Sequence, residues 1–269
     1  MPSHYNSNDH AQKCPPQFKA SDQVNPKFVP VAFGTLTGGV PTTFTATSQE
    51  PVYLKFALLQ GTGGGGVVND FTVGNQSLNC SDSDMDLAAF ASLNGRKPFI
   101  GLAVDGNIQV SMTVTIDGSG AGETFQAGLS CEAIDKAPSI AEQGSAINKF
   151  FGLGSVSVPA KAGTVNGSAE LSAQSLRGGI LIKNLMLHVH GETTTIASNG
   201  IIVKDITIKG RSIFSGQSAD GVGLNVLNSF VKAGEIGVNI PMDTNERIIV
   251  KLENTTDSAK TVGGCAFVE

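Results

Sequence analysis

The sequence contains no tryptophan, only two tyrosines among its 269 residues, and few charged residues. Charged side chains make up 15% of the chain, whereas about 25% is usual for globular proteins. Glycine is abundant instead, at 33 residues. This composition argues against a coiled coil, a helical bundle and a charged disordered chain. The core must then be built from valine, isoleucine, leucine and the 14 phenylalanines.

Positive charge is also scarce. The chain has 18 lysines and arginines, a net charge of -5, and no long basic run. Proteins that bind nucleic acids gain much of their affinity when basic side chains release counterions from the phosphates. We therefore expect no direct nucleic-acid binding by this chain.

Long apolar runs are missing as well. None approaches the ~18 residues of a membrane-spanning helix, and residues 1–20 lack the apolar stretch of about seven residues that a secretory signal needs. The four cysteines, Cys14, Cys80, Cys131 and Cys265, are widely spaced and form no CxxC or CxxH pair. We expect reduced thiols from a cytoplasmic folding compartment and no structural zinc site.

From Phe28 onward, apolar residues alternate with other residues in short segments bounded by glycine and Asp-Gly turns. This period of two predicts β-strands. In the first half the expected strands are 29–33, 44–46, 53–59, 67–78, 99–104, 108–116 and 125–134. In the second half they are 151–158, 164–171, 180–189, 201–213, 236–240, 247–252 and 262–268. The fold class is therefore predicted to be all-β.

Three places break this rhythm with helical spacing of apolar residues. One follows the polar stretch 81–86, which offers N-cap side chains. The second has the corresponding place in the second half, and the third follows Pro138 between the halves. The apolar residues concerned are Leu87, Phe90, Ala91 and Leu93; Val226, Leu227, Phe230 and Val231; Ile140, Ile147, Phe150 and Phe151. We expect a short helix at each place.

The two halves also match residue by residue. Residues 68–78 align with 203–213, at an offset of 135, and residues 128–134 align with 262–268, at an offset of 134. Two matches at nearly one offset, with a helix between them in each half, indicate an internal duplication. The alignment places Cys131 and Cys265 at equivalent points of a final strand, where we expect both to be small buried core residues.

The duplication predicts four parts: a flexible N-terminal arm over residues 1–27, a first unit over 28–135, a linker over 136–150, and a second unit over 151–269. Each unit has the size and strand number of an eight-stranded sandwich of Greek-key or jelly-roll type. We expect two tandem jelly-roll domains, each with a short helix between strands, joined by a short linker helix.

In each unit an apolar strand ends in a small polar turn that contains glycine, over residues 71–78 and 206–213, and a helix follows. Two tandem units of this kind resemble the double jelly-roll major capsid proteins of tailless icosahedral bacteriophages with an internal membrane, of the corticovirus, tectivirus and finnlakevirus type. The resemblance covers residues 28–269 as a pattern of elements.

The resemblance implies a structural viral protein without catalytic activity. Three chains would form a homotrimer with a pseudo-hexameric outline, and such trimers would tile an icosahedral shell. The N-terminal arm would lie on the inner side, against the internal membrane or adjacent capsomers. The implied partners are neighbouring capsomers and minor or vertex proteins, and the implied location is the virion capsid, assembled in the host cytoplasm.

Asp82, Asp84 and Asp86 place three carboxylates at alternate positions, a spacing that can surround a calcium ion with oxygen ligands. The full calcium-loop pattern requires a glycine where Leu87 stands. Clusters of serine and aspartate before a helix usually cap its free N–H groups. We favour the cap and keep calcium as the alternative; no other cofactor is expected.

His188 and His190 alternate on one expected strand, as metal-binding pairs on β-barrels do. Cupin-type jelly-roll enzymes also require a glycine before the first histidine and a glutamate after the second. Ile182, Thr194 and Thr195 occupy those positions here. We therefore favour a solvent-facing or interface histidine pair over a cupin-like metalloprotein.

The main alternative to a capsid protein is a tandem β-sandwich that binds carbohydrate, such as an adhesin or a viral spike. Sugar-binding grooves depend on tryptophan or tyrosine rings that stack on the ligand. The near absence of both residues weighs against this alternative.

Overall fold

The structure, a computed structural model, describes residues 26–61, 65–90, 99–118, 121–192, 199–214, 220–229 and 235–269. Within these residues the chain is mostly β-sheet, in antiparallel sheets, and the predicted all-β class is confirmed. The arm predicted over residues 1–27 lies outside the described residues except for Pro26 and Lys27, which belong to the first strand and not to an arm. No helix in the described ranges is long and apolar enough to cross a bilayer.

The first half of the chain supplies two sheets, the N-terminal sheet pair. One joins, in order, β1 (Pro26–Thr37), β9 (Ala121–Ala133), β3 (Val52–Gly61) and β7 (Phe99–Val104). The other joins β2 (Thr42–Thr47), β8 (Gln109–Ile116), β4 (Gly66–Val73) and β5 (Gln76–Ser77), with β6 (Met85–Asp86) also paired to β4. Apolar side chains from both sheets meet in one core.

The second half supplies the C-terminal sheet pair with the same connectivity. One sheet joins β10 (Phe150–Val158), β18 (Lys260–Val268), β12 (Ile180–Val189) and β16 (Glu235–Met242). The other joins β11 (Gly167–Gln174), β17 (Arg247–Asn254), β13 (Ile201–Ile208) and β14 (Arg211–Ser212), with β15 (Val222–Gly223) paired to β13. Each strand therefore has a counterpart at the same place in the other pair.

The predicted period of two accounts for both cores. Along β8, the alternate residues Val110, Met112, Val114 and Ile116 are buried while the residues between them are more exposed. The counterpart strand β17 alternates in the same way. Because successive side chains point to opposite faces of a sheet, this pattern buries one face and leaves the other for solvent.

The duplicated segment keeps its hydrogen bonds as well as its sequence. Ser77 Oγ donates to Asp70 Oδ1 at 3.0 Å in the first copy, and Ser212 Oγ donates to Asp205 Oδ1 at 2.5 Å in the second. β4 and β13 also carry a β-bulge at the same place. The single strands expected over 67–78 and 201–213 are wrong in one respect: each folds into a hairpin.

The predicted equivalence of Cys131 and Cys265 is wrong, although both are buried. Cys131 on β9 pairs with Leu54, the residue directly before the bulge in β3. The equivalent position on β18 is Val268, because it pairs with Ile182, the residue directly before the bulge in β12. The true correspondence in these strands is thus offset by 137 residues, 268 minus 131. A shift of three positions reverses the face of a strand, so Cys265 lies on the face of its sheet turned toward the N-terminal core.

Short helices occur at all three predicted places, but the third is shorter than expected: Phe150 and Phe151, which belong to its helical pattern of apolar residues, lie in β10. η1 (Leu87–Ala89) follows β6, α2 (Leu224–Ser229) follows β15, and α1 (Ile140–Gln143) with η3 (Gly144–Ile147) connects the halves. Ser139 begins α1 with a capping box, in which its side chain and Glu142 exchange hydrogen bonds with each other's backbone N–H groups. Residues 91–98 and 230–234, where the first and second sets of predicted positions continue, lie outside the described residues.

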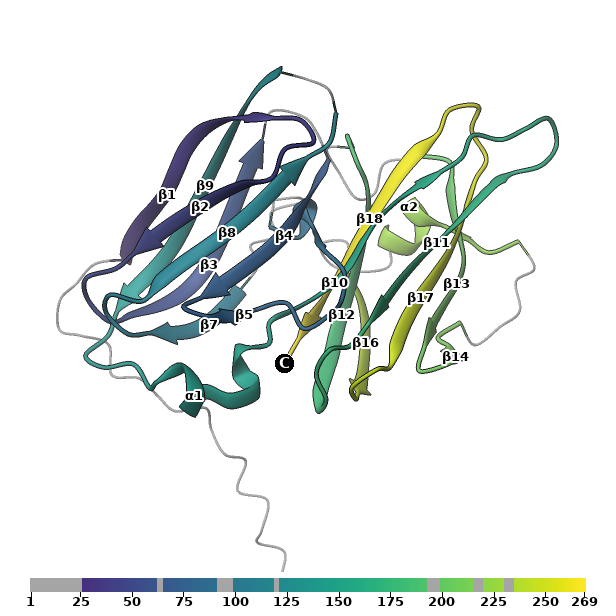
Figure 1. Cartoon of the computed structure of the whole chain (residues 1–269). Coiled ribbons are helices and arrows are strands. Elements are labelled where there is room, and N and C mark those ends of the chain that lie inside the picture. The colour runs from purple at the N-terminus through teal and green to yellow at the C-terminus, as the bar shows by residue number, and fades with distance from the viewer. Residues whose placement is uncertain are drawn as a thin grey trace, which may run out of the picture.

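The two sheet pairs stand side by side, and the sheet β10-β18-β12-β16 lies between the two cores (Figure 1). One of its faces contributes Phe151 to the C-terminal core, and the other contributes Phe150, Met186 and Cys265 to the N-terminal core. The Phe150 ring lies 4.8 Å from the Phe90 ring, centroid to centroid. This sheet therefore serves both cores, and its outer face forms the junction of the two pairs.

Candidate functional site at the junction of the two sheet pairs

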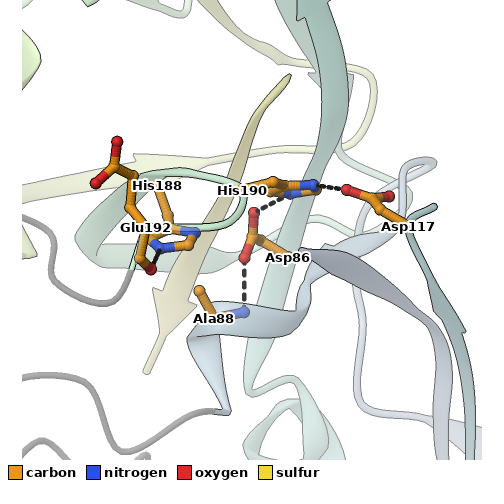
Figure 2. A network of polar contacts seen from close by, with 6 residues as sticks. All are labelled: Asp86, Ala88, Asp117, His188, His190 and Glu192. Atoms are coloured by element: carbon orange, nitrogen blue, oxygen red, sulfur yellow. Dashed lines mark hydrogen bonds and ion pairs between the residues drawn. The ribbon is translucent and has the colours of Figure 1, made fainter. Parts of the chain in front are cut away.

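His190 connects the two sheet pairs (Figure 2). It follows β12 directly, and its Nε2 lies 3.0 Å from Oδ2 of Asp86 on β6. Its Nδ1 contacts Oδ2 of Asp117, which follows β8. One imidazole of the C-terminal pair is thus held between two carboxylates of the N-terminal pair. We call these three residues the His190 triad.

Asp86 performs two tasks with its two oxygens. Oδ2 faces His190, while Oδ1 accepts a hydrogen bond from the Ala88 N–H at 2.6 Å and caps η1. The predicted N-cap before this helix is therefore confirmed and assigned to Asp86. Because one carboxylate binds both the helix start and the histidine, the position of η1 is tied to the C-terminal pair.

The triad is largely enclosed. The side chain of Asp86 is 1% exposed and that of His190 4%, whereas Asp117 is 43% exposed. Burial by itself lowers the pKa of His190, but the two hydrogen-bonded carboxylates outweigh it and raise the pKa to about 9. His190 is therefore an imidazolium at neutral pH, and each ring N–H donates to one carboxylate.

Two glycines make room for this arrangement. A Cβ at Gly65, which precedes β4, would overlap the His190 ring. A Cβ at Gly263 on β18 would overlap Asp86 Oδ2 and approach His190 Nε2. Glycine is required at both positions because the ring and the carboxylate pass against the backbone there.

His188 shares this face of β12 but has a separate partner. Its Nε2 donates to the Glu192 carbonyl oxygen at 2.9 Å, and its Nδ1 has no hydrogen-bond partner among the described residues. The rings of His188 and His190 lie 6.3 Å apart. The predicted histidine pair therefore lies at an interface inside the chain and does not face solvent.

The three carboxylates considered for calcium point to different parts of the molecule. Asp82 Oδ1 accepts from the Gln174 N–H at 2.7 Å, and Asp84 Oδ2 accepts from the Asn69 side chain at 3.0 Å. Asp86 belongs to the His190 triad. In the described part of the chain, no group of three or more His, Cys, Asp or Glu residues is placed to hold a metal ion.

The cysteines offer no reactive thiolate in the described ranges. Cys80, Cys131 and Cys265 are buried and remain thiols, as predicted, while Cys14 lies outside the described residues. Burial raises the pKa of Cys80 to about 12 and that of Cys131 to about 11. At neutral pH the thiols of Cys80 and Cys131 are protonated and act as small apolar groups.

Comparison with known proteins adds no relative. No protein-family model matches the sequence, and a search of the curated proteins returned no match. The interpretation of function therefore depends on the duplicated architecture and on the junction that the His190 triad forms.

Proposed function

We propose that this protein is the major capsid protein of an icosahedral virus, with a structural role and no catalytic activity. The observation that carries the proposal is the shared strand order of the two sheet pairs. In each pair the first, ninth, third and seventh strands form one sheet, and the second, eighth, fourth and fifth strands form the facing sheet. We infer from this order that each pair is a jelly roll, with units over 28–135 and 151–269.

The side-by-side arrangement of the two pairs supports this role (Figure 1). If each chain contributes two similar barrels, a trimer presents six similar edges, and one kind of lattice contact can be repeated around it. Such trimers would tile the shell as pseudo-hexameric capsomers of a bacteriophage virion. The arm over residues 1–27 would contact the internal membrane or neighbouring capsomers, and minor or vertex proteins would complete the shell.

The described surface also favours a shell protein over a carbohydrate-binding module. The large hydrophobic side chains exposed on it are Val40, Val165, Leu176 and Val226, and none of them is aromatic. A stacking platform for sugar rings would need an exposed tryptophan or tyrosine. The histidine pair likewise gives no support to a cupin-like site, because both nitrogens of His190 already bind carboxylates.

The test is the assembly state of the pure, full-length protein. Light scattering over a range of concentrations, followed by electron microscopy, should reveal trimers and closed particles of uniform size. A chain that remains monomeric throughout the micromolar range would overturn the proposal.

A further inference from the structure

The junction already has a large apolar component that would hold the two sheet pairs together without a salt bridge. Phe150 is fully buried against Phe71 and Phe90 of the N-terminal pair, with ring centroids 6.1 and 4.8 Å away. Apolar contact is non-directional, so it favours close packing but tolerates rotation or sliding. The buried charges of His190 and Asp86 add a directional constraint, because each remains compensated only where the two groups face each other.

The triad is absent from the corresponding places of the duplicated structure. Asp86 pairs with Val67 on β4. The counterpart of Val67, 135 positions later in the chain, is Ile202 on β13, and it pairs with Gly223. Gly223 is therefore the counterpart of Asp86. Glycine cannot supply the carboxylate that Asp86 supplies. The helix start of the C-terminal pair therefore lacks the acceptor for a histidine.

The same comparison applies to Asp117 and His190. Asp117 directly follows Ile116, the residue of β8 that pairs with the first residue of β4. In the C-terminal pair, Asn254 of β17 pairs with the first residue of β13, and the residue that follows Asn254 is Thr255. The chain contains four histidines, at positions 4, 10, 188 and 190, so residues 26–135 contain none. The C-terminal pair therefore has no counterparts of the two aspartates, and the N-terminal pair has no counterpart of His190.

We propose that the His190 triad is an orientation lock: it fixes how the C-terminal sheet pair sits on the N-terminal pair of the same chain. The lock depends on geometry and charge that occur at this one junction. One consequence rests on the proposed function: where copies of the chain meet through the surfaces equivalent to this junction, the lock cannot form. Contacts within and between chains would then remain chemically distinct.

The test measures the distance between the two pairs. Spin labels are attached to V40C and V165C, on the β1–β2 and β10–β11 connections, where the native side chains are 50% and 68% exposed. The described native cysteines are buried, and Cys14 is replaced by serine so that labelling is specific. Labelled chains are diluted with unlabelled ones so that only distances within one chain are observed. We expect a single narrow distance distribution.

In H190Q we expect that narrow distribution to be lost while the β-sheet circular dichroism is retained. D117N, which keeps the shape and removes one charge at the exposed end, should broaden the distribution less, and it provides the test if H190Q does not fold. The matched control is K209Q. It removes a cation from an ion pair of 3.1 Å with Glu246 inside the C-terminal pair and should leave the distribution narrow.

Unchanged narrow distributions in folded H190Q and D117N would overturn the lock. The outcome is separable from the proposed function, since the distance is measured within one chain and assembly by light scattering. If the protein is monomeric but the H190Q distance distribution broadens, the orientation lock is supported and the capsid function is contradicted. If the protein forms particles but the distance distributions of H190Q and D117N are unchanged, the capsid function is supported and the orientation lock is contradicted.

Discussion

At the scale of the residue, the proton on His190 links stability to pH. The folded-state pKa is about 9, against 6.5 for the free side chain. The stabilising contribution of the imidazolium is therefore fully present below pH 6.5 and is lost as pH rises through about 9. That difference in pKa corresponds to at most about 3 kcal/mol, an upper bound because solvent screens the interaction with the half-exposed Asp117.

Urea unfolding at intervals from pH 6 to pH 10 should show this fall in the free energy of unfolding. H190Q is the control, because it shares every other titrating group and should be less stable at pH 6 with a flatter profile. Parallel profiles for the two proteins would contradict the assignment of the proton to His190.

Part of this site was predictable from the sequence, for identifiable reasons. Alternation along a strand placed His188 and His190 on one face, and the polar stretch before Leu87 indicated a cap. The partnership of His190 with Asp117 could not be predicted, because these residues are 73 positions apart and belong to different halves. Such a pair is created by the way the sheets dock, which no local pattern encodes.

At the scale of the element, the two copies of the duplicated hairpin provide an internal comparison. Asp70 accepts from Ser77 as Asp205 accepts from Ser212, at exposed positions of the two sheet pairs. We expect D70A and D205A each to lower the free energy of unfolding by about 0.5–1.5 kcal/mol. Because the sites lie in different sheet pairs, the double variant should lose about the sum.

Urea titration of both single variants and the double variant checks this, with D257A as the control. Asp257 is exposed in the connection between β17 and β18, and its substitution should change stability little. A large loss in one copy and none in the other would show that the hairpins, though alike in sequence, are not equivalent in energy.

The elements themselves were largely predictable, and the exceptions have physical causes. β7 and β12 begin and end where alternation indicated, since each is a continuous strand whose inward positions are apolar. The segments expected as single strands over 67–78 and 201–213 each contain a chain reversal. The sequence did not reveal it, because residues on both sides of each turn continue the apolar pattern. The offset between β9 and β18 was misjudged because glycine, alanine and cysteine fit either face of a strand.

At the scale of the whole molecule, two consecutive phenylalanines belong to different cores. Phe150 and Phe151 are both fully buried, but Phe150 packs in the N-terminal core and Phe151 in the C-terminal core. Successive residues of a strand point to opposite faces, so one step along β10 moves a side chain from one core to the other. Truncation of either ring to alanine should destabilise the protein by about 3–5 kcal/mol.

The two truncations should act in different places although they remove the same group. Hydrogen exchange should quicken mainly in β4 and β8 for F150A, and mainly in β13 and β17 for F151A. Each variant is the control for the other, because the chemical change and the strand are the same. Quicker exchange in the same strands for both variants would mean that the two cores unfold as one unit. Distinct patterns would mean that β10-β18-β12-β16 joins two separately stabilised bodies, which the His190 triad then has to hold in one orientation.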